Sequence, residues 1–361
     1  MYCQEISLNE KRKNENMLND KPTVIVTGGA GYIGSHTIIE LLTNTNYHVV
    51  SIDNYSNSSK STYDRVKAIT QKSVDFYEID LCIPGDVEKV FGAYKNIIGV
   101  IHFAAFKSVS ESVANPFKYY SNNINSQLNV LQACLKFNIR NFIFSSSCSV
   151  YGNINALPVS EKTVLNKAES PYAFTKQVGE EILKDYCLIN KNLQSIALRY
   201  FNPVGAHISG LNGENPINKA SNLVPIITQT AIGKLPMMEV CGNDYKTRDG
   251  SCIRDYIHVT DIAIAHINAL NYLLENKQKS NFELFNLGTG NGVSVLEAIA
   301  SFEKISGVKL NYKIGPRRPG DVEAIYSDTS FTEKILGWKA KFTLDEMMDS
   351  AWKWEKNCAE K

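Results

Sequence analysis

Tyr172 and Lys176 are the first residues whose types and spacing suggest chemistry. They lie four residues apart in a segment, 172–188, with the pattern of a helix, so both side chains are expected on one helix face. A tyrosine hydroxyl has a pKa of about 10, and a neighbouring ammonium stabilises the phenolate and lowers that pKa. The pair is therefore a candidate general base, although the same spacing also occurs by chance on solvated helices.

Three serines, Ser145, Ser146 and Ser147, follow a short apolar strand expected at 141–144. Ligands of parallel α/β sheets bind beyond the carboxyl ends of the strands, so a serine there can share a hydrogen bond with a substrate and Tyr172. The alternative is that these serines only end the strand. Together with Tyr172 and Lys176, Ser147 predicts a proton-transfer site at this edge of a sheet.

A glycine-rich turn follows the first expected strand and opens a helix. Glycines at 28, 31 and 34 permit a tight turn and a close approach of the backbone to a phosphate. The N-terminus of the helix then attracts the negative charge of that phosphate. The turn, with a strand before it and a helix after it, predicts a dinucleotide site.

Two acids follow the next strands of the pattern. Asp53 ends the second expected strand, where a carboxylate accepts both hydroxyls of a ribose and repels an additional phosphate. This position predicts NAD rather than NADP as the cofactor. Asp80 follows the third strand and is a candidate acceptor for the adenine amino group. The alternative is a cap, because acids at strand ends often serve as caps.

The elements that must position these residues alternate between short β-branched strands and longer helices. Such alternation predicts an α/β fold with a parallel sheet covered on both faces. After residue 200 the pattern loosens, so we divide the chain into a nucleotide-binding domain, 22–200, and a smaller α/β substrate domain, 201–361, with some segments crossing back. The expected strands are 23–26, 49–52, 74–79, 100–103, 141–144, 195–198 and 282–286, and the expected helices are 35–43, 87–94, 126–137, 172–188 and 344 to about 357.

Composition narrows the class of protein. The 361 residues include 38 basic and 37 acidic side chains without long runs of one sign, which argues against a nucleic-acid partner. No apolar run approaches the roughly 20 residues that cross a bilayer, and the polar start, 1–21, predicts a disordered extension. The eight cysteines form no C-x-x-C pair, so we expect free thiols, no metal site and a cytoplasmic protein.

Taken together, these segments resemble the extended short-chain dehydrogenase/reductase family, and within it the UDP-glucose 4-epimerases. The resemblance covers about residues 22–356 and rests on motifs in the same order. In the first half they are Thr27–His36, Asp53–Ser58, His102–Lys107, Phe144–Gly152 and Ser170–Lys176. In the second half they are Arg199–Ala206, Gly242–Tyr245, Arg254–Val259, Asn286–Gly290 and Arg317–Asp321.

The resemblance implies a Rossmann-type, doubly wound sheet and the inversion of the 4-hydroxyl of a UDP-sugar. Tyr172 is then the base that removes the hydroxyl proton, Ser147 is its hydrogen-bond partner, and Lys176 lowers its pKa. Hydride leaves C4 for NAD and returns to the opposite face of a 4-keto sugar, so NAD is a bound cofactor. UDP-glucose and UDP-galactose are the implied substrates.

The resemblance also assigns binding roles. Asn202 and Asn222, considered without it, are ordinary loop residues. The implied cofactor contacts are Gly28, Gly31, Tyr32, Ile33, Gly34, Asp53, Asn54, Asn57, Ser58, Asp80, Leu81, Phe103, Ala104, Ala105, Lys107, Asn122, Ser145, Tyr172, Lys176 and Phe201. The implied contacts to the UDP-sugar are Lys107, Ser147, Tyr172, Asn202, Asn222, Leu223, Val240, Arg254, Arg318 and Asp321.

Substrate range and assembly are implied by the resemblance as well. The family places a gating residue at Ile325, where a small residue resembles forms that accept N-acetylated sugars and a tyrosine resembles forms that exclude them. Isoleucine is neither small nor a tyrosine, and we expect the protein to accept only UDP-glucose and UDP-galactose as substrates. Family members usually pair through two helices per subunit, here 127–137 and 178–188, so the implied assembly is a homodimer.

Three other functions remain alternatives on the same fold. The family's 4,6-dehydratases carry an Asp-Glu pair where this chain has Cys148 and Ser149, which argues against dehydration. An enzyme acting on UDP-glucuronate needs groups for its carboxylate, and residue types alone do not decide that question. A non-catalytic dinucleotide sensor keeps the glycine turn but typically lacks the tyrosine base, which is present here.

Overall fold

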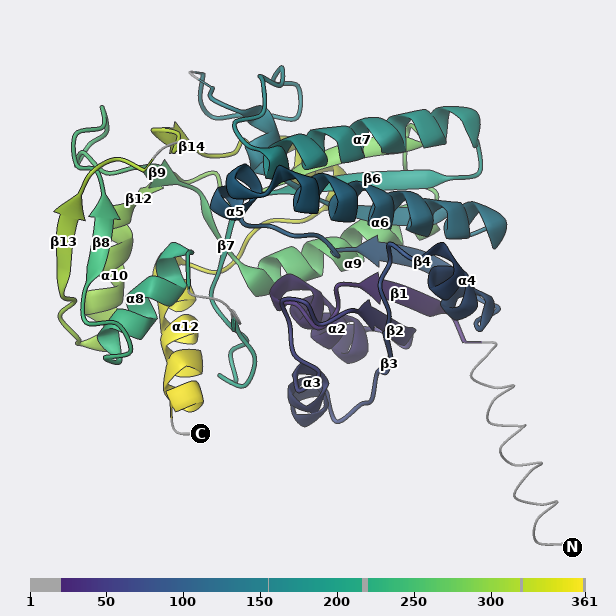
Figure 1. Ribbon diagram of the computed structural model, residues 1–361, viewed down its shortest axis with the longest axis horizontal. Helices are drawn as coiled ribbons and strands as arrows, with labels where there is room; N and C mark the ends of the chain where they lie inside the picture. Colours follow the sequence, from purple (N-terminus) through teal and green to yellow (C-terminus); the bar gives the residue numbers. More distant parts are fainter. Residues whose placement is uncertain (1–20, 155, 216–219, 319–320, 360–361) are drawn as a thin grey trace, which may run out of the picture.

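A central sheet of parallel strands organises the computed structural model, which describes residues 21–154, 156–215, 220–318 and 321–359 (Figure 1). Apart from Lys21, the extension predicted at 1–21 lies outside these residues. The seven strands of this sheet, all within the described residues, are β1 (Thr23–Thr27), β2 (His48–Asp53), β3 (Asp75–Glu78), β4 (Ile97–His102), β5 (Asn141–Ser147), β6 (Gln194–Tyr200) and β11 (Phe282–Leu287).

The strand order is β11–β6–β5–β4–β1–β2–β3, and every neighbouring pair is parallel. The chain therefore winds outward in both directions from the boundary between β1 and β4. Such a boundary is the switch point at which ligands of doubly wound sheets bind. The predicted fold, a Rossmann-type doubly wound parallel sheet, is confirmed.

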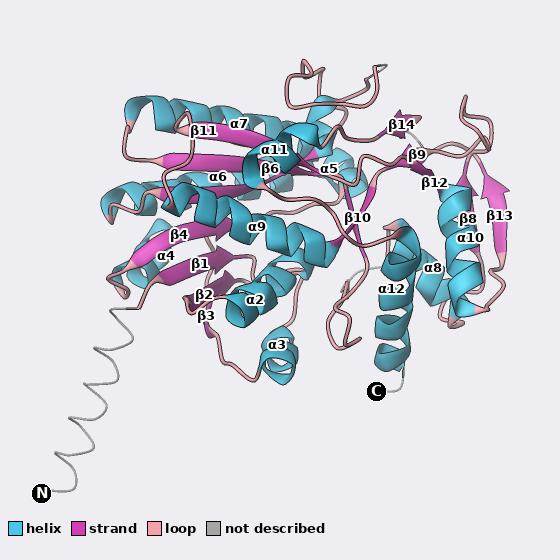
Figure 2. Cartoon of the chain, turned by 180° about the vertical axis from the view of Figure 1, so that it is seen from behind, coloured by secondary structure: helices cyan, strands magenta, loops and turns pink. Residues whose placement is uncertain are grey.

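Helices cover both faces of this sheet (Figures 1 and 2) because its inner strands are apolar on both sides. In β1, Val24 and Val26 pack into one core cluster and Ile25 into the other. The helices packed on both faces hold the strands in place, and the ends of the strands are thereby positioned. The helices around the sheet are α2 (Tyr32–Asn44), α3 (Thr62–Thr70), α4 (Pro84–Gly92), α5 (Val109–Ala114), α6 (Pro116–Lys136), α7 (Pro171–Ile189), α9 (Val259–Leu274) and α11 (Ser330–Leu336).

A smaller α/β region lies beside the carboxyl ends of the sheet (Figure 1). Its strands pair in short sets, β10 with β7, β9 with β12 and β14, and β8 with β13, around a separate apolar cluster. The elements are β7 (Asn202–Val204), α8 (Leu223–Ala231), β8 (Met238–Cys241), β9 (Ile253–Arg254), β10 (Tyr256–His258), β12 (Val293–Ser294), α10 (Val295–Ser306), β13 (Tyr312–Gly315), β14 (Ala324–Ile325) and α12 (Leu344–Ala359). In the described part of the chain, no helix is both long enough and apolar enough to cross a membrane.

Two elements differ from the expectations. The strand expected at 282–286 in the second half is β11, which pairs with β6 in the large sheet. Its apolar pattern predicts a strand, but the pattern carries no information about the partner. The helix expected at 126–137 is the second half of α6, because the polar start of α6 is capped by Asn115, which accepts from the Lys118 backbone. The division of the chain near residue 200 stays a prediction.

Candidate active site

The glycine turn between β1 and α2 is shaped by contacts that leave no room for a side chain. Gly28 has a φ of +69°, and a Cβ on it would lie 2.8 Å from the backbone nitrogen of Ala104. A Cβ on Gly34 would lie 2.3 Å from the Gly28 carbonyl oxygen. The turn is therefore packed against the end of β4. No side chain caps the N-terminus of α2, at Gly31, so its first turn is open to an anionic group.

Asp53, at the end of β2, is fixed beside this turn. One carboxylate oxygen accepts from the Ala30 backbone (3.0 Å), and the other accepts from the Tyr55 backbone (2.9 Å) and the Ser58 hydroxyl (2.7 Å). Burial raises the pKa of Asp53, and these hydrogen bonds oppose the shift. The sequence-predicted acid is thus an oriented acceptor next to the glycine turn.

Most of the other predicted cofactor contacts lie just after the carboxyl ends of further strands of the sheet. Asp80 and Leu81 follow β3, and the Asp80 carboxylate accepts from the Cys82 backbone at 2.8 Å. The segment after β4 contains the contacts from Phe103 to Lys107, and Phe201 follows β6. Parallel pairing therefore brings these segments to one edge of the sheet, whereas Asn122 reaches that edge from α6. Three predicted contacts in the loop after β2 lie near Asp53: Asn54 and Asn57, which are exposed, and Ser58.

The three catalytic candidates meet where β5 and α7 adjoin. Ser147 is the last residue of β5, and Tyr172 and Lys176 lie on the first turns of α7. The Lys176 ammonium donates to the Ser145 carbonyl at 2.6 Å and lies 6.0 Å from the centre of the Tyr172 ring. The Ser147 hydroxyl accepts from the Ser149 hydroxyl at 3.0 Å. The predicted serine, tyrosine and lysine are thus brought together.

Burial controls the ionisation of this group in the protein alone. It raises the pKa of Tyr172 to about 12, against a hydrogen bond with Ser147 that lowers it. It also lowers the pKa of Lys176 to about 7, against the charge of Glu180 that raises it. Both shifts favour the uncharged form. The lower tyrosine pKa expected from the sequence is therefore not a property of the protein alone and stays a prediction for the ligand-bound site.

Two arginines converge on one acid in the smaller region. Arg318 donates to both carboxylate oxygens of Asp321, at 2.8 and 3.1 Å, and Arg254 lies 3.6 Å from one of them. Arg318 remains largely exposed, whereas Arg254 and Asp321 are mostly covered. Two guanidinium groups with only one carboxylate between them leave net positive charge, which suits a diphosphate.

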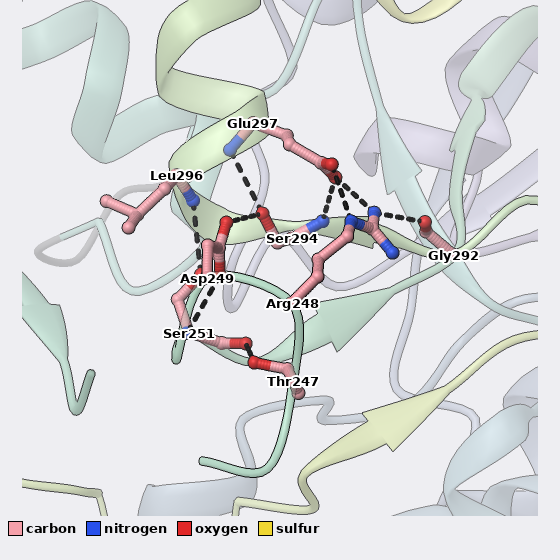
Figure 3. A network of polar contacts seen from close by, with 8 residues as sticks. All are labelled: Thr247, Arg248, Asp249, Ser251, Gly292, Ser294, Leu296 and Glu297. Atoms are coloured by element: carbon pink, nitrogen blue, oxygen red, sulfur yellow. Dashed lines mark hydrogen bonds and ion pairs between the residues drawn. The ribbon is translucent and has the colours of Figure 1, made fainter. Parts of the chain in front are cut away.

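A polar network supports the strand that bears Arg254 (Figure 3). Ser294 caps α10 in a capping box with Glu297, and β12, which ends in Ser294, pairs with β9. Arg248 donates to Glu297 and, at 2.7 Å, to the Gly292 carbonyl, while Asp249 accepts from Ser294. The loop before β9 and the start of α10 are thereby held together, which limits the movement of Arg254.

The remaining predicted substrate contacts lie on other elements of the smaller region. Asn202 begins β7, and its buried side-chain oxygen has no hydrogen-bond partner among the described residues, which makes it a candidate acceptor for a ligand. Asn222 precedes α8, and Leu223 begins it. Val240, on β8, is buried in the core cluster of the smaller region. Within the described residues, no three His, Cys, Asp or Glu side chains gather as a metal site.

Comparisons with known proteins agree with this arrangement. A family model described as GDP-mannose 4,6 dehydratase matches residues 25–351. The UDP-glucose 4-epimerase of Pasteurella multocida is 46% identical over 333 residues, which cover 92% of this chain and 97% of that protein. The enzyme of the same name from Drosophila melanogaster is 46% identical over 340 residues, which cover 92% and 96%. The chain belongs to the UDP-glucose 4-epimerase family.

Solved structures support the assignment to the UDP-glucose 4-epimerase family. The crystal structure of the Bifidobacterium longum UDP-glucose 4-epimerase, in complex with NAD+ and UDP, is 46% identical and has a TM-score of 0.89. The match covers 93% of this chain and 98% of that one. The similarity therefore extends over nearly the whole chain rather than over the nucleotide-binding part alone.

Two features of this UDP-glucose 4-epimerase family member were missed by the sequence analysis. Asn123, next to the predicted Asn122, bonds both backbone groups of Phe106 and the Thr175 hydroxyl. It thereby joins the loop after β4 to helix α7. Its position on a helix face that meets two other segments is a tertiary property, and no sequence pattern marked it.

The second missed feature is a buried ion pair beneath helix α7. Glu180 accepts from Arg199 at 2.9 and 2.6 Å and from the Ser146 hydroxyl at 2.6 Å, and all three side chains are almost fully buried. Arg199 also lies over the Tyr151 ring, at 4.8 Å from its centre. The only sign of this pair in the sequence is the Glu180 carboxylate, one helical turn after Lys176. Its partner, Arg199, lies on another element, and no local pattern marks the two as partners.

Replacing Glu180 tests the importance of this pair. Glu180→Gln leaves the buried Arg199 charge uncompensated and is expected to lower the free energy of unfolding by about 3–5 kcal/mol. Glu181→Gln, on the same helix, removes only a surface pair with Lys184 and should change it by less than about 1 kcal/mol. Urea unfolding followed by circular dichroism measures both variants. Equal, small losses would contradict the structural role of the pair.

Proposed function

We propose that the protein interconverts UDP-galactose and UDP-glucose with bound NAD. The observation that carries the proposal is the placement of Ser147, Tyr172 and Lys176 at the sheet edge that also bears the glycine turn, with Arg254 and Arg318 on the smaller region. The relatives match nearly the whole chain, and their names point to the same reaction. The seven cysteines within the described residues form no disulfide, which supports the cytoplasm as the compartment we propose.

The residues at the sheet edge fit NAD. The turn at Gly28 has no room for a Cβ, the N-terminus of α2 is uncapped, and the Asp53 carboxylate is oriented beside both. These are the features that a pyrophosphate and a ribose without a 2′-phosphate require. Lys176 and the loop after β4 would hold the nicotinamide half. When bound, NAD supplies a reversible hydride acceptor for C4 of the sugar.

The chain's own residues handle the proton and the anchoring. Tyr172 takes the proton from the sugar 4-hydroxyl and returns it, and Ser147 orients that hydroxyl. Arg254 and Arg318 bind the diphosphate, with Asp321 holding the two guanidinium groups in position. Inversion requires the sugar to turn over between the two transfers, so the protein must hold the UDP end firmly and the sugar loosely.

The site argues against the dehydratase alternative. Dehydration across C5 and C6 requires an acid and a base beside the sugar. At the positions after Ser147 the chain has Cys148, whose pKa burial raises to about 12, and Ser149, whose hydroxyl donates to Ser147. Neither group exchanges a proton readily near neutral pH. We therefore prefer epimerisation, although the family model bears the name of a dehydratase.

Turnover of UDP-galactose tests the proposal. The purified protein without added NAD is expected to form UDP-glucose, because NAD remains bound between turnovers. Tyr172→Phe should lower kcat by about 10²–10⁴-fold, since it removes the general base, and should leave UDP affinity nearly unchanged. Product formation is followed by a coupled assay. No turnover even with added NAD would overturn the proposal, and UDP-glucuronate and dTDP-glucose would be tested next.

Ile325 is proposed to restrict the substrate at C2. It is buried against Val150, Tyr151 and Phe201 and pairs with Arg254 in the sheet register. The wild type should convert UDP-galactose but not UDP-N-acetylgalactosamine, and Ile325→Ala should gain turnover of the latter because the side chain no longer fills the space. Val159→Ala, in the same cluster, is the control. Equal use of both substrates by the wild type would contradict this role.

We propose that the protein forms a homodimer through α6 and α7, which pack side by side (Figure 1). Both helices expose large apolar side chains, among them Phe117 (78% exposed) at the start of α6 and Phe174 (46% exposed) on α7. Sedimentation at micromolar concentration should give twice the chain mass. Phe117→Glu should weaken the dimer, and Ile208→Glu, at an exposed loop position elsewhere, should not. A wild-type monomer would refute the proposal.

A further inference from the structure

Glu214 lies between the two halves of the active site and has no role in the reaction described above. It follows β7 in a loop, and its side chain is only 11% exposed. One carboxylate oxygen accepts both from the Lys107 ammonium at 3.0 Å and from the Asn222 amide at 2.7 Å. Lys107 follows β4 in the large sheet, whereas Asn222 precedes α8 in the smaller region. A single atom therefore joins a proposed cofactor contact to a proposed substrate contact.

The loop that bears Glu214 is held in place by its backbone. The Glu214 carbonyl accepts from the Trp354 indole at 3.0 Å, and a Cβ on Gly213 would lie 2.5 Å from the Trp354 ring. Two residues before Glu214, Asn212 donates to the Ser35 hydroxyl on α2 at 2.9 Å. The carboxylate is thus aimed by contacts with both α2 and α12.

Asn222 behaves unusually for a residue at a helix start. It is the N-cap of α8, where an asparagine normally accepts a backbone hydrogen bond from the first turn, but its side chain makes no such bond. Its amide donates to Glu214 instead. The amide is therefore oriented by the carboxylate rather than by its own helix.

A carboxylate next to an anionic ligand repels it unless cations neutralise the carboxylate. Lys107 supplies that neutralisation, and a shared ion pair of this kind fixes a flexible lysine in one direction. Tyr32, at the start of α2, lines the same cavity as Glu214, and its hydroxyl donates to the Gly205 carbonyl at 2.6 Å. The carboxylate thus lies close to the helix that follows the glycine turn.

We propose that Glu214 is a positioning residue that couples the cofactor side of the active site to the UDP side by orienting Lys107 and Asn222 together. This inference rests on the proposed function, because both partners matter here as ligand contacts. Loss of the carboxylate frees the lysine and the amide at once. Binding at either side then no longer supports binding at the other.

Glu214→Gln removes the charge and keeps the shape of the side chain. UDP binding to the purified holoprotein is measured by calorimetry, retention of NAD by gel filtration, and kcat and KM with UDP-galactose. We expect the Kd of UDP and the KM to rise about tenfold, with faster loss of NAD, and kcat to stay within about twofold of wild type. Glu214→Asp, which keeps the charge, should lie between Glu214→Gln and wild type, and it carries the test if the glutamine variant does not fold.

Glu355→Gln is the matched control. Glu355 is also a mostly buried carboxylate in the same cavity, and it pairs with Lys234 at 2.7 Å and with Thr228 at 3.2 Å, but its partners are not proposed ligand contacts. The UDP affinity of Glu355→Gln should equal that of the wild type. An equal rise in Kd for Glu355→Gln, or wild-type values for Glu214→Gln, would overturn the inference. A wild type that neither binds UDP nor converts UDP-galactose would instead overturn the proposed function, and this inference with it.

Discussion

A buried ion pair between Glu180 and Arg199 joins helix α7 to the sheet, and the geometry of the candidate site depends on it. Helix α7 bears Tyr172 and Lys176 near its start, whereas Arg199 lies on β6 inside the sheet. Removing both charges from water is unfavourable, and their close contact offsets that penalty only while its geometry is kept. The pair therefore resists sliding or rotation of α7 over β6, which would separate Tyr172 from Ser147.

The three serines at the end of β5 show how this constraint reaches the reacting groups. The Ser146 hydroxyl donates to Glu180, the Ser145 carbonyl accepts from Lys176, and the Ser147 side chain faces the Tyr172 hydroxyl. Three consecutive residues of β5 thus anchor helix α7, bind Lys176 and contact Tyr172. A run of three serines that only ended a strand would not require these three different partners.

Local sequence patterns predicted much of the fold and of the site. The strand ends, the glycine turn, Asp53 and the four-residue spacing of Tyr172 and Lys176 depend on neighbouring residues, and the parallel pairing then brought them to one edge. What the patterns did not predict depends on contacts between distant segments. The pairing of β11 with β6 and the contacts of Glu214 join elements far apart in the chain, and the Glu180–Arg199 pair joins a helix to the strand that follows it. The residue types involved do not identify these partners on their own.

The ionisation of the catalytic group links the chemistry to ligand binding. Burial raises the pKa of Tyr172 to about 12 and lowers that of Lys176 to about 7, so the protein alone favours a protonated tyrosine and a partly neutral lysine near neutral pH. A phenolate becomes accessible only when bound groups compensate its charge. In the mechanism proposed above, Tyr172 therefore acts as a base only beside bound cofactor and sugar, with the diphosphate held by Arg254 and Arg318. Firm anchoring of the UDP end, as we propose, would let the sugar turn over beside Tyr172 without being released.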